Sequence, residues 1–84
     1  MKTIWKYELD IATEQSINIP CPAKLLKVAE QNKVLCVWME VDTTNKKELQ
    51  KFYIRGTGEP FTEYENRYCG SVVMSYGLVW HVYT

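Results

Sequence analysis

The sequence has no excess of basic residues, since ten lysines and arginines balance ten aspartates and glutamates. Proteins that grip duplex nucleic acid neutralise its phosphates with a surplus of Lys and Arg, so we expect no duplex partner. No apolar run approaches the roughly 20 residues that span a bilayer. The charged opening, MKTIWKYELD, is unlike a secretory signal peptide. We therefore expect a cytoplasmic protein with no membrane partner.

Histidine and cysteine are scarce as well. His81 is the only histidine, which excludes sites built on two or more, such as HExxH metalloenzymes. Cys21, Cys36 and Cys69 are odd in number and scattered singly, unlike a disulfide framework or the paired ligands of structural zinc. A nucleophile pair of Cys69 and His81 is conceivable if the last two strands pair, but no orienting group is visible. The sequence thus predicts no metal and no cofactor.

The residues that are present are typical of a small β domain. A hydrophobic fraction of 46% with 24% charged residues excludes a disordered chain. Six Tyr, three Trp and two Phe suit a pleated, half-buried surface, and in 84 residues several rings must be partly exposed. Without a linker or repeat, residues 1–84 should form a single domain. Zero net charge does little to oppose self-association, so a homo-oligomer is compatible with the composition.

Alternating polarity predicts most of the secondary structure. KTIWKYEL at the start alternates with a period of two, as in a strand with one apolar face. VLCVWMEV is almost continuously apolar and should be the central, most buried strand. Tyr76 and Gly77 provide a turn for a closing hairpin. Strands are expected at residues 2–9, 16–19, 34–41, 49–55, 68–75 and 78–83.

Residues 23–31, AKLLKVAEQ, are compatible with two structures. Pro22 can start a helix, and Leu25, Leu26 and Ala29 have helical spacing. We favour a strand, because its side chains also alternate and Asn32-Lys33 makes a tight turn into the next strand. One short helical turn fits residues 61–67. The sequence predicts an all-β, mainly antiparallel fold, a small sandwich or barrel of six or seven strands.

The stretch IRGTGEP, residues 54–60, is the most suggestive of a ligand. A dinucleotide fingerprint requires a third glycine where Phe61 stands, and a Walker loop requires a lysine that is missing. Pro60 also keeps Glu59 out of helical geometry. Two interpretations stay open. The stretch is a turn by which a strand leaves the sheet, or it is a loop whose backbone approaches an anion beside an outward-pointing Arg55.

The candidate site is drawn around this loop. Aromatic and basic residues on either side of it offer ring faces for a base and donors for an anion. We expect no catalytic residues and no metal ligands. The expected ligand-binding residues are Arg55, Gly56, Thr57, Gly58, Tyr64, Arg67, Trp80 and His81.

Three landmarks along nearly the whole chain carry a family resemblance: the KTIWKYEL opening, the GTG-x-P loop at residues 56–60, and the aromatic-His-Val-aromatic ending at residues 80–83. In this order they resemble a family of small bacteriophage and prophage proteins known only as a domain of unknown function. The resemblance implies a setting, the cytoplasm of an infected host bacterium, and brings no catalytic residues. Very small phage accessory proteins often resemble non-enzymatic antagonists of host defence that act by stoichiometric binding.

Several functions remain open on this basis. The first is sequestration of a small nucleotide-type immune signal, for which the loop and the aromatic residues are the motivation. The second is a protein-binding inhibitor that covers a host defence enzyme or CRISPR effector by edge-strand pairing. A minor virion or assembly component is a third. We expect no enzyme, and a signal-degrading hydrolase is the enzymatic alternative.

Overall fold

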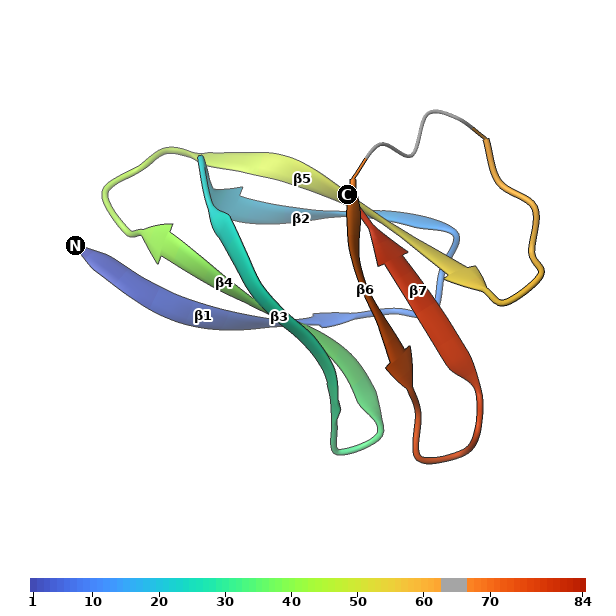
Figure 1. Ribbon diagram of the computed structural model, residues 1–84. Coiled ribbons are helices and arrows are strands. Elements are labelled where there is room, and N and C mark those ends of the chain that lie inside the picture. The colour runs from blue at the N-terminus through green and yellow to red at the C-terminus, as the bar shows by residue number, and fades with distance from the viewer. Residues whose placement is uncertain (63–66) are drawn as a thin grey trace.

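The computed structural model describes residues 1–62 and 67–84, which form seven strands and no helix (Figure 1). All strand pairs are antiparallel, and the strands lie in two sheets with orders β1-β4-β3 and β2-β5-β7-β6. No helix of the described residues could cross a bilayer. The strands are β1 Lys2–Leu9, β2 Glu14–Pro20, β3 Lys24–Gln31, β4 Val34–Asp42, β5 Lys47–Gly56, β6 Tyr68–Val73 and β7 Val79–Tyr83.

The all-β, antiparallel prediction is confirmed, with seven strands in a two-sheet sandwich. The strand favoured over a helix at residues 23–31 is confirmed over residues 24–31, because β3 pairs with β4 there, with a register shift between Leu25 and Lys27. The closing hairpin is shorter than expected, since β6 ends at Val73 and residues 74–78 make the turn. The short helical turn expected at residues 61–67 falls largely on residues 63–66, which lie outside the described residues.

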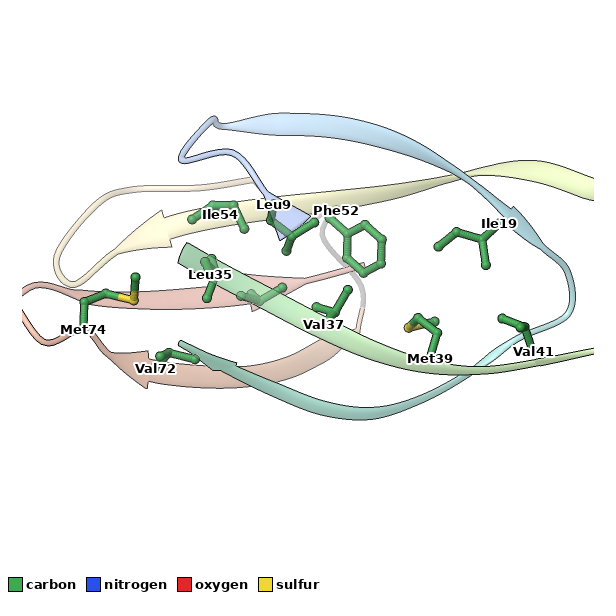
Figure 2. Close-up of a cluster of buried hydrophobic side chains, with 11 residues drawn as sticks. Leu9, Ile19, Leu35, Val37, Met39, Val41, Phe52, Ile54, Val72 and Met74 are labelled. Carbon is green, nitrogen blue, oxygen red and sulfur yellow. The ribbon is translucent and has the colours of Figure 1, made fainter. Parts of the chain in front are cut away.

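The core lies between the two sheets and explains why β4 is so apolar. Alternate residues of β4 point into it, and they face Phe52 and Ile54 of β5 (Figure 2). Phe52 is completely buried. Each such side chain contributes about 1.5–3 kcal/mol by leaving water, so this layer stabilises the sandwich. The buried cluster consists of Leu9, Ile19, Leu35, Val37, Met39, Val41, Phe52, Ile54, Val72, Met74 and Val82.

The two sheets also meet at one side, where β3 lies beside β6. Gly70 sits against Val28, and a Cβ at Gly70 would lie 3.5 Å from the valine side chain. The carboxylate of Glu30 accepts hydrogen bonds from the Ser75 backbone amide (2.7 Å) and hydroxyl (3.0 Å). The β6–β7 hairpin is thereby attached to the opposite sheet, which fixes the frame on which the candidate site is built.

The tight turn between β3 and β4 contains backbone strain. Asn32 and Lys33 both have positive φ, 52° and 65°, as a type I′ turn requires. Asparagine tolerates this conformation, whereas lysine has a Cβ that collides with the following carbonyl oxygen. Glycine would have no such collision.

We expect Lys33→Gly to raise the free energy of unfolding by about 0.5–1 kcal/mol, because the relief of strain exceeds the added flexibility of the unfolded chain. Urea unfolding followed by tryptophan fluorescence measures this. Lys27→Gly is the matched control: Lys27 is exposed within β3, where glycine should lower stability. A loss of stability in Lys33→Gly would contradict the assignment of strain to this turn.

Candidate functional site

The stretch IRGTGEP ends β5 in a four-residue turn. The Glu59 amide donates to the Gly56 carbonyl at 3.1 Å, and Gly58 has a φ of +85°. A positive φ at the third position with this bond is the mark of a type II turn, which calls for glycine there. The interpretation of this stretch as the turn that leaves the sheet is confirmed. Whether it also holds a ligand depends on the residues around it.

The strand register builds two rows of side chains on the outer face of the four-stranded sheet. Partners in an antiparallel ladder share a face. Arg55 of β5 therefore stands beside His81 of β7, which in turn faces Ser71 of β6. One step along, Tyr83 of β7 lies between Tyr53 of β5 and Tyr68 of β6.

These rows border a shallow pocket of about 220 Å³ beneath the turn. Of the eight residues predicted to bind a ligand, five lie together here: Arg55, Gly56, Thr57, Gly58 and His81. We call this site the loop pocket, and its lining residues are Arg55, Gly56, Thr57, Gly58, Glu59, Phe61, His81 and Tyr83.

A chain of hydrogen bonds leads from the loop pocket to Tyr68 on β6. The Thr57 hydroxyl is 2.8 Å from Nε2 of His81, and Ser71 Oγ is 2.6 Å from Nδ1. The Tyr68 hydroxyl is 2.6 Å from Ser71 Oγ. Both imidazole nitrogens are thus engaged, and the ring orientation is fixed. If Tyr68 donates to Ser71 and Ser71 to His81, Nε2–H donates to Thr57, whose own proton is then available to a ligand.

Arg55 does not point outward as the anion-clamp interpretation required. Its side chain is only 8% exposed, and Nη1 donates to the carbonyls of Thr13 (2.7 Å) and Ile54 (3.0 Å). The guanidinium also lies 5.9 Å from the centre of the Tyr53 ring. The guanidinium turns inward because the carbonyl of Thr13, in the β1–β2 connection, lies within hydrogen-bond distance of Nη1. Arg55 still lines the loop pocket, but as a buried, anchored cation.

Aromatic rings form one edge of the loop pocket. The ring centres of Phe61 and Tyr83 are 5.3 Å apart, and those of Tyr68 and Tyr83 are 5.5 Å apart. Phe61 and Tyr68 are each more than half exposed. Their faces are therefore available for stacking by a planar group. We call Phe61, Tyr68 and Tyr83 the aromatic edge.

Three of the predicted residues lie elsewhere. Trp80 faces the opposite side of β7, where it packs against the core and donates from Nε1 to the Tyr76 hydroxyl at 3.1 Å. Arg67 is exposed outside the loop pocket. Tyr64 lies outside the described residues. Trp80 lies outside the loop pocket because alternation along β7 puts it on the other face from His81.

The alternative pairing of Cys69 with His81 is not found. The last two strands do pair, but a register shift between Tyr68 and Gly70 places Ser71 opposite His81. The Cys69 thiol points to the Arg67 carbonyl at 3.7 Å, and burial raises its pKa, which disfavours the thiolate. Within residues 1–62 and 67–84, no group of three metal-ligating side chains is found.

Sequence reasoning missed five residues of this region. Glu59 and Phe61 adjoin the loop, and Tyr83 lies two residues after His81 on the same strand face, so simple alternation would have found them. Ser71 and Tyr68 could be found only from the β6–β7 register, which depends on the shift at Cys69.

Comparison with known proteins gives a family. A family model described as a domain of unknown function, DUF7352, matches residues 1–84. A search of the curated proteins and a search of the solved structures found no match.

Proposed function

We propose that the chain, which belongs to the DUF7352 family of unknown function, is a non-enzymatic binding protein for a small nucleotide-type ligand. One observation carries the proposal. The loop pocket brings the hydroxyl of Thr57, which His81 holds in place, next to the cation of Arg55 and to the exposed ring of Phe61. Phosphate and base are the two ends of a nucleotide; the Thr57 hydroxyl and the Arg55 cation would receive the phosphate, and the aromatic ring would receive the base.

The size of the loop pocket indicates how such a ligand would lie. Sites that enclose a whole drug-sized molecule have volumes of about 300–1,000 Å³. A pocket of about 220 Å³ holds a phosphate or one ring. We infer that the phosphate enters beneath the turn and that the base rests against the aromatic edge.

The hydrogen bonding of His81 favours binding over catalysis. In hydrolytic triads a carboxylate orients the histidine and stabilises the imidazolium. Here hydroxyl groups from Thr57 and Ser71 hold the ring, and among the described residues no carboxylate bonds to it. These hydrogen bonds fix the orientation of the His81 ring and of the Thr57 hydroxyl. Without a carboxylate partner, the imidazole is poorly suited to act as a proton-transfer base.

The biological setting is also a proposal. The resemblance to small bacteriophage and prophage proteins supports a role in the cytoplasm of an infected bacterium, where the protein would sequester a nucleotide immune signal stoichiometrically. Two measurements test this: mass spectrometry of small molecules released by heating natively purified protein, and calorimetric titration with a panel of cyclic nucleotides. A protein that releases no nucleotide and gives no heat with the panel would contradict the proposal.

The hydroxyl of Thr57 should contribute directly to affinity. Thr57→Val keeps the shape of the side chain but removes the donor, so we expect nucleotide affinity to fall about tenfold or more. Thr62→Val, a change of the same kind at an exposed position, should leave affinity unchanged. Calorimetry measures both variants, and thermal unfolding verifies that they fold. Equal affinity in the two variants would remove Thr57 from the site.

A protein-binding inhibitor is the second candidate, and the exposed edge of β1 favours it. This strand has eight residues and pairs on one side only, with β4. Ile4 is 57% exposed and Trp5 is 37% exposed. Such an edge can accept an added strand from a partner. Ile4→Glu should abolish binding of this kind while leaving nucleotide binding intact, which separates the two candidates.

A further inference from the structure

The carboxylate of Glu59 occupies the place in the loop pocket where the anionic group of a ligand would bind. Oε1 of Glu59 accepts a hydrogen bond from the Gly56 amide at 3.2 Å, and Oε2 lies 3.9 Å from Nε of Arg55. The type II turn produces this arrangement, because it returns Glu59 over the start of the turn. A carboxylate therefore rests between a backbone donor and a buried cation.

The contacts of this carboxylate are weaker than those that anchor Arg55. A charge-assisted N–H···O bond is about 2.7–2.9 Å long, and Arg55 has one of that length to Thr13. Its distance to Glu59 is 3.9 Å, and the Glu59 side chain is 42% exposed. An ion pair at this distance with one partly exposed partner contributes little. The cation is thus fixed, while the carboxylate can move into solvent.

We propose that Glu59 is a built-in competitor, whose carboxylate occupies an anion site until an anionic ligand displaces it. The idea rests on the proposed function, since the site is that of the ligand's phosphate. The phosphate would take over the contacts that Glu59 makes with the Gly56 amide and Nε of Arg55, and the Thr57 hydroxyl lines the same pocket. Three donors suit the three oxygens of a phosphate monoester better than the two oxygens of a carboxylate. A neutral nucleoside would not displace Glu59.

Calorimetric titration of the wild type and Glu59→Gln tests this, with adenosine monophosphate, inorganic phosphate, acetate and adenosine as the probes. In Glu59→Gln we expect affinity for adenosine monophosphate and phosphate to rise about fivefold, because the competing charge is gone. Affinity for adenosine should be unchanged, and acetate should gain less than phosphate. Glu48→Gln removes the same charge from an exposed position at the start of β5, and should alter affinity less than twofold.

The affinities of the three proteins separate the competitor role of Glu59 from the proposed function. If the wild type binds adenosine monophosphate and Glu59→Gln binds it no more tightly, the competitor role is wrong and the proposed function stands. An equal gain in Glu48→Gln would assign the effect to overall charge and also overturn the inference. If neither protein binds adenosine monophosphate, phosphate or adenosine, the inference is wrong, and the proposed function fails with it only when the wild type also gives no heat with the cyclic nucleotides.

Discussion

Replacement of Phe52 with alanine should lower the free energy of unfolding by about 3–5 kcal/mol, the largest effect expected of any substitution considered. Phe52 is completely buried in β5, and it packs between the two sheets against residues of β4 (Figure 2). Alanine would remove most of that contact area and leave a cavity that a thin sandwich refills poorly. A domain of 84 residues has little stability in reserve, so a large share of the molecules should unfold at 37 °C.

Equilibrium unfolding in urea measures the loss in Phe52→Ala, and Leu49→Ala is the matched control. Leu49 lies on the same strand but is 72% exposed, so its replacement should alter stability by less than about 0.5 kcal/mol. If the two variants lost similar amounts, β5 would not run through the core in the register described.

Replacement of Arg55 with methionine should cost about 2–3 kcal/mol of stability and also remove the binding of anionic ligands. Methionine keeps much of the length of the side chain but has no donors. The bonds from Nη1 to the carbonyls of Thr13 and Ile54 would be lost, and we assign most of the cost to the shorter bond to Thr13, since a hydrogen bond to a charged group contributes about 1.5–3 kcal/mol. The bond to Thr13 joins the segment between β1 and β2 to the end of β5, so its loss should loosen both segments.

Arg67→Met is the matched control for Arg55→Met. Arg67 is exposed, and its replacement should leave stability within about 0.5 kcal/mol of the wild type. Thermal unfolding and calorimetry with adenosine monophosphate compare the two variants. A stable Arg55→Met protein would show that the bonds to the two carbonyls are not structural. A folded variant that binds the nucleotide normally would remove Arg55 from the site.

Most of the fold was predictable from the sequence because it depends on local patterns. Alternation in KTIWKYEL and the apolar run of β4 predicted β1 and the central strand of its sheet. The Asn32-Lys33 turn decided between strand and helix for β3, since only a strand can lead into a type I′ turn. The end of β6 was less predictable, because residues 74–78 close the hairpin with a five-residue turn.

The candidate site was predictable only where its residues are neighbours in sequence. The residues of the turn were predicted as one stretch, whereas His81 lies beside them because β5 pairs with β7, which does not follow it in sequence. The direction of Arg55 depends on the carbonyl of Thr13, more than 40 positions away, which no local pattern reveals. Ser71 and Tyr68 depend on a register shift at Cys69. Long-range contacts therefore set the chemistry of the loop pocket.

The most direct test of a nucleotide site at the loop pocket is a two-dimensional ¹H–¹⁵N NMR titration of the wild type with cyclic nucleotides. We predict saturable shifts of the backbone amides of Gly56, Thr57, Gly58 and Tyr83, with little change elsewhere. A second hollow, of about 400 Å³, lies along the first half of β5 beside Leu49 and Lys51. Shifts confined to that hollow, or no shifts with any nucleotide, would contradict a ligand site beneath the turn.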